Sequence, residues 1–136
     1  MRVLIDTNVV LDVLRERTPH VVASTAVLAA VESGRVTGLL GATTVTTLHY
    51  LTSQFLGVRR ASRHIKTLLS LFEIAPVDMG VLRDAFELEF ADYEDAVLHE
   101  AARRSHAEAI VTGDQSGFKR ATLPVYAPAE LLAILK

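Results

Sequence analysis

The stretch Val3-Leu4-Ile5-Asp6-Thr7-Asn8 decides the fold of this chain. Three apolar residues in a row, two of them β-branched, predict a short buried strand. The strand ends at Asp6, whose carboxylate does not belong in an apolar core, and Thr7 and Asn8 can cap a helix that begins near Val9. We therefore expect Asp6 at the carboxyl end of an early, central strand, where open α/β sheets bind ligands. The alternative is that Asp6 only caps the following turn.

Composition limits the classes of protein that the chain can form. With 136 residues, half of them hydrophobic and 22% charged, it is expected to fold as one domain over residues 1–136. It has no cysteine, which excludes disulfides and thiolate zinc sites and fits a reducing cytoplasm. No apolar run reaches the roughly 18 residues that span a bilayer, so we expect a cytoplasmic protein without membrane contact. The net charge of −2 means that a polyanionic partner would require a local basic patch.

Short apolar runs alternate with helical patterns along the rest of the chain. Further strands are predicted at residues 36–42, 73–77, 109–112 and 124–126, and helices at 9–14, 19–33, 43–57, 59–72, 78–89, 92–105 and 128–135. This alternation is typical of βαβ units with helices on both faces of a parallel sheet. We therefore expect a three-layer α/β/α sandwich with a central, mainly parallel sheet of about five strands.

Acidic residues stand where predicted strands end or a helix begins. Asp6 ends the first strand, and Asp114 follows the strand at 109–112 by two residues. These two should converge if their strands are neighbours, since parallel strands point their carboxyl ends to one edge. Asp92 and Asp95 lie in the first turn of a helix that runs opposite to the strands, so we expect them at the other edge. Helix capping explains Asp92 and Asp95 as well as a site does, and Asp114 can be a turn residue.

If the carboxylates converge, the chemistry of the site is constrained. Neighbouring carboxylates repel and raise one another's pKa unless a cation offsets them. A ligand set made of oxygen atoms favours Mg²⁺ or Mn²⁺ over zinc. Such an ion polarises a phosphodiester and activates bound water, which predicts a metal-dependent nuclease.

These residues together resemble the PIN domain family, and within it the small bacterial VapC-type toxins. The resemblance is carried by Val-Leu-Ile-Asp-Thr-Asn at 3–8, Asp-Tyr-Glu-Asp-Ala at 92–96 and Ile-Val-Thr-Gly-Asp at 110–114, with Phe118 four residues later. It extends over essentially the whole chain. It implies a parallel α/β/α sandwich whose acidic pocket binds Mg²⁺ or Mn²⁺ and cleaves RNA, and it places Asp95 beside Asp6 and Asp114.

By position, the resemblance assigns metal binding and catalysis to three acids: Asp6, Asp95 and Asp114. Two accessory acids are expected at the mouth of the pocket: Asp92 and Glu94. The chain departs from the family at Thr47, in place of its second acid, and at Ser116, in place of an extra acid. Three carboxylates can still hold one Mg²⁺ with water completing the octahedron, and Thr47 and Ser116 can hydrogen-bond those waters. Thr7 or Asn8 can orient the attacking water or a phosphate oxygen.

The resemblance implies a Mg²⁺- or Mn²⁺-dependent endoribonuclease that leaves a 5′-phosphate and is the toxin of a toxin–antitoxin pair. The expected partners are RNA, a cognate antitoxin and a second copy of the chain. The helix at 43–57 carries apolar residues around more than one face; part of them is expected in the core, and the remainder suggests a dimer interface or an antitoxin groove: Leu48, Tyr50, Leu51 and Phe55. One alternative is a weakened PIN-like module that binds RNA or protein without cleavage, which the absence of an acid at Thr47 motivates. Another is a phosphoacceptor receiver domain, which would need an acceptor Asp where this chain has Ala75-Pro76-Val77.

Basic residues and His99 complete the candidates. One group lies on a face of the helix at 59–72 and is either an ordinary solvated face or a track for an RNA backbone: Arg59, Arg60, Arg63 and Lys66. A second group flanks the loops after Asp6 and Asp114 and is better placed to contact phosphates: Arg15, Arg17, Lys119 and Arg120. His99 lies four residues after Asp95 and could share a metal with it, although a structural histidine is the favoured interpretation.

Overall fold

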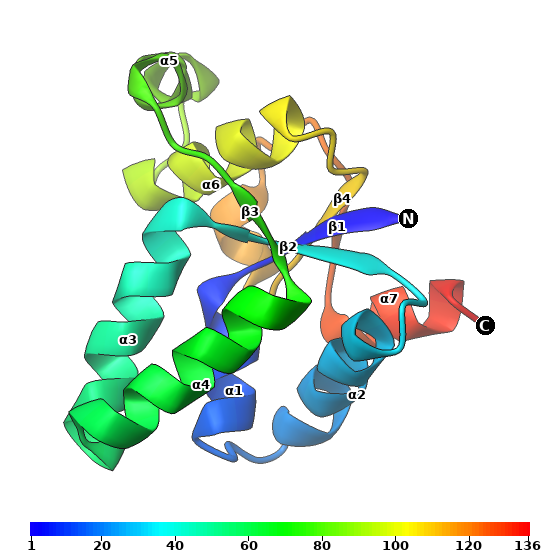
Figure 1. Ribbon diagram of the computed structural model, residues 1–136. Coiled ribbons are helices and arrows are strands. Elements are labelled where there is room, and N and C mark those ends of the chain that lie inside the picture. Colours follow the sequence, from blue (N-terminus) through cyan, green and yellow to red (C-terminus); the bar gives the residue numbers. More distant parts are fainter.

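The sheet has five strands: β1 (Arg2–Ile5), β2 (Thr37–Gly41), β3 (Glu73–Ala75), β4 (Ala109–Val111) and β5 (Val125–Tyr126). The computed structural model describes residues 1–136 and orders these strands β3-β2-β1-β4-β5, all parallel (Figure 1). The predicted parallel sheet with a central first strand is therefore confirmed. Ile5 pairs with Val111, so β1 and β4 end side by side at one edge.

Seven α-helices and two 3₁₀ helices accompany the strands, and the last α-helix follows the final strand. The α-helices are α1 (Thr7–Leu14), α2 (Val21–Glu32), α3 (Ala42–Leu56), α4 (Val58–Leu71), α5 (Met79–Asp84), α6 (Tyr93–Arg104) and α7 (Pro128–Ile134), and the 3₁₀ helices are η1 (Ala85–Leu88) and η2 (Gln115–Phe118). No helix of the fold is both long and apolar enough to cross a membrane.

Several predicted boundaries are wrong in detail. The first helix begins at Thr7, because Asp6 itself is its N-cap, and α3 begins at Ala42 without a side-chain cap. The helix expected over 78–89 is α5 followed by η1, which ends where Glu89 adopts a left-handed conformation with φ 57°. The segment after the strand predicted at 109–112 forms η2, with Asp114 as its N-cap.

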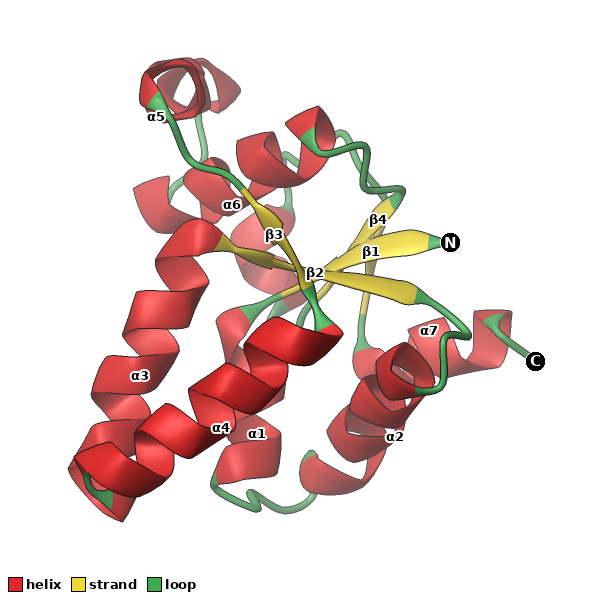
Figure 2. Ribbon diagram, viewed as in Figure 1, coloured by secondary structure: helices red, strands yellow, loops and turns green.

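The alternation of side chains along β1 separates two cores. Val3 and Ile5 pack with α1, α2, α4 and α7 on one face of the sheet. Leu4 points to the other face and packs with α6 and the segment of α5 and η1. Figure 2 shows this three-layer arrangement, with the strands between the two groups of helices. Because both faces are covered, the strands are mainly apolar after their first residues, which are Arg2 in β1, Thr37 in β2 and Glu73 in β3.

Candidate active site

Asp6 leaves β1 at the edge of the sheet and is almost completely buried, with 7% of its surface exposed. Its Oδ1 accepts a hydrogen bond from the backbone N–H of Thr7 at 2.7 Å and thereby caps α1. Its Oδ2 accepts a hydrogen bond from the Thr112 hydroxyl at 2.8 Å. Asp6 is therefore a helix cap, as the simpler interpretation held, and its buried carboxylate is also the centre of a polar network.

Thr112 is the part of this network that the sequence interpretation missed. It is fully buried directly after β4, donates to Asp6, and accepts the backbone N–H of Asp114 at 3.1 Å. Asn8 adds a second connection, because its Oδ1 accepts the N–H of Gly113 at 2.9 Å while its Nδ2 lies 3.4 Å from Asp6 Oδ2. The signal for Thr112 was its place between an apolar strand and Gly-Asp. Asn8 thus positions the strand end in this structure.

Asp95 lies at the same edge as Asp6, and the expectation that α6 begins at the opposite edge is wrong. A helix that connects parallel strands runs antiparallel to them, so it starts at the edge where the strands end. Asp95 lies close enough to Asp6 and Asp114 for their charges to raise its pKa. Its Oδ2 packs on Gly117 of η2. A Cβ at Gly117 would lie 2.5 Å from that oxygen, so any larger residue here would displace the Asp95 carboxylate.

Asp114 and the accessory acids complete the acidic cluster. Asp114 accepts hydrogen bonds from the backbone N–H and the hydroxyl of Ser116, so Ser116 binds this acid directly. Asp92 is the N-cap of α6 and accepts the backbone N–H of Asp95 at 3.2 Å. Glu94 is exposed beside them.

The cluster carries negative charge that no cation of the chain offsets. Burial raises the pKa of Asp95 to about 7, with further contributions from Asp6, Asp92, Glu94 and Asp114. Burial also raises the pKa of Asp6, against the opposing hydrogen bonds from Thr112 and Thr7. Both pKa shifts have the direction expected of carboxylates gathered without a counter-ion.

The donor chemistry of the cluster fits a divalent cation. The acids of the cluster offer carboxylate oxygens as metal ligands, and Mg²⁺ and Mn²⁺ prefer such ligands. A bound cation would also relieve the repulsion that raises the pKa of Asp95. The acids do not stand as a closed set of three metal-ligating side chains. Binding of an ion therefore requires the side chains to move closer to one another. The hydrogen bonds from Thr112 to Asp6 and from Ser116 to Asp114 can persist, because each carboxylate keeps further lone pairs.

Thr47, the departure from the family pattern, lies beside the cluster and is half-buried. It lines a cavity of about 280 Å³ together with Thr43, Thr46, Tyr93 and Glu94, among others. Neither Thr47 nor Ser116 supplies a carboxylate to the cluster. The Thr7 hydroxyl lies 3.0 Å from that of Thr44, where the two share a hydrogen bond.

The basic residues separate into groups with different surroundings. Lys119 and Arg120 follow η2 directly and line a small pocket beside the cluster. Arg17 instead pairs with Asp12 at 3.1 Å, and the Arg15 guanidinium lies over the Phe55 ring, 4.5 Å from its centroid. Arg60 and Arg63 line a separate cavity on α4 with His64 and Thr67.

His99 is a structural residue. It is fully buried, and its Nε2 accepts the backbone N–H groups of Thr122 and Leu123 at 3.0 and 3.3 Å. Burial lowers the pKa of its imidazole, so the ring is neutral at pH 7. The acceptor role of Nε2 fixes the segment before β5 and leaves that nitrogen unable to bind a metal.

The apolar residues of α3 are mostly part of the core. Leu48 is fully buried, Leu51 packs against the core, and the ring of Phe55 is covered by Arg15. Only Tyr50 is freely exposed, at 64%. The predicted interface along α3 is therefore reduced to one residue of the four.

Comparison with known proteins identifies the family. A family model described as PIN domain matches residues 2–116. The sequence is similar to Ribonuclease VapC1 of Aquifex aeolicus (strain VF5), with 25% identity over 120 residues that cover 85% of this chain and 83% of that protein. The fold is similar to a chain of a toxin–antitoxin complex from Klebsiella pneumoniae, with a TM-score of 0.70, 19% identity and coverage of 93% of this chain and 97% of that one. It is also similar to VapC20 of Mycobacterium tuberculosis, a sarcin–ricin loop cleaving toxin, with a TM-score of 0.67, 12% identity and coverage of 83% and 90%.

These matches confirm the resemblance drawn from the three sequence motifs and the predicted sandwich. The match to the family model includes Asp6, Asp95, Asp114 and the whole of β1 to β4. The chain belongs to the PIN domain family.

Proposed function

We propose that this protein is a Mg²⁺- or Mn²⁺-dependent endoribonuclease. The observation that carries the proposal is the convergence of Asp6, Asp95 and Asp114 at one sheet edge, with the pKa of Asp95 raised to about 7. The similarity to a protein named as a ribonuclease and to an RNA-cleaving toxin supports RNA as the substrate.

The proposed roles follow from the hydrogen bonds around each acid. Asp6, Asp95 and Asp114 would hold the ion, which when bound supplies polarisation of the phosphodiester and activation of water. Thr112 and Asn8 keep Asp6 and the end of β4 in register, and Asp92 fixes the first turn of α6. Ser116 orients the Asp114 carboxylate, and Glu94 adds negative charge at the mouth.

The test combines metal binding and cleavage on the same samples. Wild type should bind Mn²⁺ in calorimetry and cleave single-stranded RNA, and Asp6→Asn and Asp114→Asn should lose both while unfolding as cooperatively as wild type. Glu87→Gln, an exposed acid of η1, is the matched control and should lose neither. Cleavage retained by Asp6→Asn would refute the assignment.

A second candidate is a PIN-like module that binds RNA or a protein without cleaving it. Its motivation is the hydroxyl of Thr47 where the family pattern has an acid. RNA binding by wild type without metal-dependent cleavage would favour this candidate over the nuclease.

We further propose a cognate antitoxin as partner, as in the toxin–antitoxin complex to which the fold is similar. The support is an apolar cavity of about 270 Å³ between α2 and α4, lined in part by Leu14, Leu28, Leu68 and Leu71. Leu28→Glu should prevent co-purification with a candidate antitoxin and leave RNA cleavage unchanged.

A homodimer is the proposed state of the free protein. Exposed apolar side chains gather on the segment from α5 to the start of α6: Met79, Leu82, Phe86 and Tyr93. The rings of Phe86 and Tyr93 stack with centroids 4.3 Å apart, which makes a firm apolar surface for a second copy. Light scattering should report a dimer for wild type and a monomer for Phe86→Glu.

A further inference from the structure

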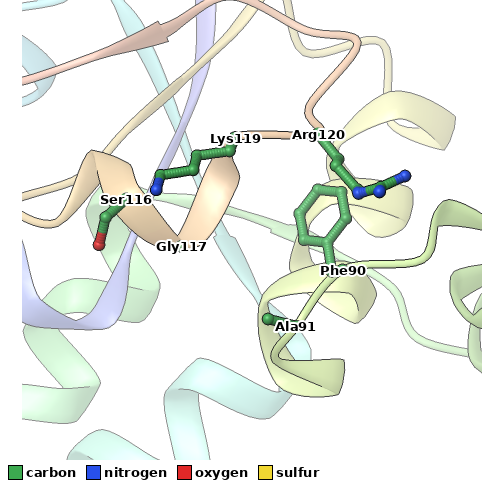
Figure 3. Close-up of a pocket in the computed structure, with 6 residues that line it drawn as sticks. All are labelled: Phe90, Ala91, Ser116, Gly117, Lys119 and Arg120. Carbon is green, nitrogen blue, oxygen red and sulfur yellow. The ribbon is translucent and has the colours of Figure 1, made fainter.

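A small pocket lies on the η2 side of the acidic cluster and has a composition unlike that of the cluster. It encloses about 150 Å³ and is lined by Phe90, Ala91, Ser116, Gly117, Lys119 and Arg120. Figure 3 shows the aromatic ring of Phe90 and the guanidinium group of Arg120 turned towards each other, and the ammonium group of Lys119 turned towards Ser116. One aromatic residue and two cationic residues therefore line a space too small for a drug-sized ligand, while the Ser116 hydroxyl binds Asp114.

The pocket and the acidic cluster share a wall. Ser116 donates its backbone N–H to Asp114 at 3.2 Å, and Gly117 packs against the carboxylate of Asp95. A polymer whose reacting group lies at the acids would therefore place its neighbouring unit in the pocket.

Phe90 is held as a rigid platform. Its ring meets that of Phe118 edge-on, with centroids 5.9 Å apart, and that of buried His99 at 5.4 Å. The chain reaches Phe90 through the left-handed turn at Glu89, whose φ is 57°. These contacts hold the back of the ring, while the half-buried side chain keeps part of its surface on the pocket. Such a ring loses little conformational entropy when a planar group stacks on it.

The cations of the pocket are available to an anion. Arg120 makes one exposed ion pair, with Glu89, whose atoms are 3.4 Å apart. Lys119 is exposed and stands next to it on the same turn. An exposed pair of this length contributes little, so an incoming phosphate can replace Glu89 as partner of Arg120.

We propose that this pocket binds one unstacked nucleobase of the RNA, beside the scissile phosphate, with the base stacked on Phe90 and an adjoining phosphate held by Lys119 and Arg120. The proposal rests on the proposed ribonuclease function and adds a nucleoside subsite to it. Single-stranded RNA is recognised in this way, by bases that stack on aromatic rings and guanidinium planes while cations follow the backbone.

The test uses a tryptophan as reporter, because the chain contains none. In an Asp6→Asn background, which prevents cleavage, Phe90→Trp places the only tryptophan in the pocket. We expect short homopolymeric RNAs to quench its fluorescence and a base-free ribose-phosphate oligomer of equal length to leave it unchanged. Tyr50→Trp, at an exposed position of α3, is the matched control and should respond to neither probe.

A second pair of variants separates the base from the phosphate. Phe90→Leu keeps the apolar packing against Phe118 but removes the stacking face, and should weaken binding of base-containing RNA about tenfold without affecting the base-free oligomer. Lys119→Gln should weaken binding of both probes and reduce the dependence of binding on salt.

The outcomes distinguish this proposal from the ribonuclease function. Quenching by RNA without cleavage by wild type would support the pocket and refute the nuclease. Cleavage by wild type without quenching, or equal loss by Phe90→Leu for both probes, would refute the pocket and leave the nuclease standing. Failure of both probes to bind would refute the pocket.

Discussion

Thr112 connects the two strand ends on which the proposed site depends, since its hydroxyl donates to Asp6 and accepts from the backbone of Asp114. We predict that Thr112→Val destabilises the fold by about 1–2 kcal/mol, because it leaves a buried carboxylate oxygen without its donor. The cleavage rate should fall about ten- to a hundredfold, because Asp6 and Asp114 would be displaced from their positions. Thr112→Ser keeps the hydroxyl and should retain most of the folding stability and most of the cleavage rate. Urea unfolding and cleavage rates measure the two effects, and equal loss in the serine variant would contradict the role of the hydroxyl.

At the same scale, the role proposed for Asp95 opposes the stability of the fold. With a folded pKa of about 7, its ionised form at pH 8 is held among other negative charges. Asp95→Asn should therefore raise stability at pH 8 by about 1–2 kcal/mol, less than the full pKa difference because solvent screens a partly exposed group. The same substitution should abolish cleavage.

The control for this prediction is the same stability measurement at pH 5. At pH 5 only the first part of the interval between the unfolded pKa of 3.8 and the folded pKa of about 7 has been passed, so the stabilisation by Asp95→Asn should fall to roughly a third of its value at pH 8. Thermal unfolding at both pH values decides the point. A gain of the same size at pH 5 and pH 8 would show that repulsion is not its cause.

At the scale of the element, the first turn of α6 combines a cap and a charge in Asp92. Asp92→Ser keeps a capping oxygen and removes the charge, so the fold should keep its stability while the pKa of Asp95 falls below about 7. Asp92→Ala removes both and should cost about 1 kcal/mol. Urea unfolding and an NMR titration of Asp95 separate the two effects. A serine variant as unstable as the alanine variant would show that capping is not what Asp92 contributes.

The elements also show how far the sequence could be interpreted. The apolar run at 3–5 was enough to predict a buried central strand, because a strand covered on both faces has no polar position. The strand pattern alone placed Asp95 at the wrong edge, because the antiparallel direction of α6 was recognised while its starting edge was not; the family resemblance placed it beside Asp6 and Asp114. Thr112 was missed because a threonine after a strand has no periodicity of its own. Its partners, Asp6 and Asp114, are a property of the β1–β4 pairing, which no local pattern encodes.

For the whole molecule, two buried groups give stability opposite pH dependences. Burial lowers the pKa of His99 from 6.5, so below that pH the unfolded chain binds more protons and stability falls as pH falls. The pKa of Asp95 is raised from 3.8 to about 7, so between these values the folded chain binds more protons and stability falls as pH rises. We predict that His99→Gln reduces the loss of folding stability that occurs as the pH falls from 6.5 to 5.

Urea unfolding of wild type and His99→Gln across this pH range measures the difference. Asp95→Asn is the comparison, and it should make stability fall more steeply as the pH falls from 6.5 to 5. Parallel pH curves for wild type and His99→Gln would mean that another group causes the acid-side loss. The loss of the hydrogen bonds to Thr122 and Leu123 lowers the whole curve of the glutamine variant, so the shape of the curve is the informative quantity.

The hydrogen bond between Thr112 and Asp6 joins residues 106 positions apart in the chain. A ribosome therefore makes one half of the acidic site early and the other half only after α6 and β4 have been synthesised. Until then β1 lacks the neighbour that brings Asp114 to it. If the site cuts RNA, a nascent chain cannot cleave the mRNA or the ribosomal RNA that is producing it. The activity arises only when translation of the chain is nearly complete.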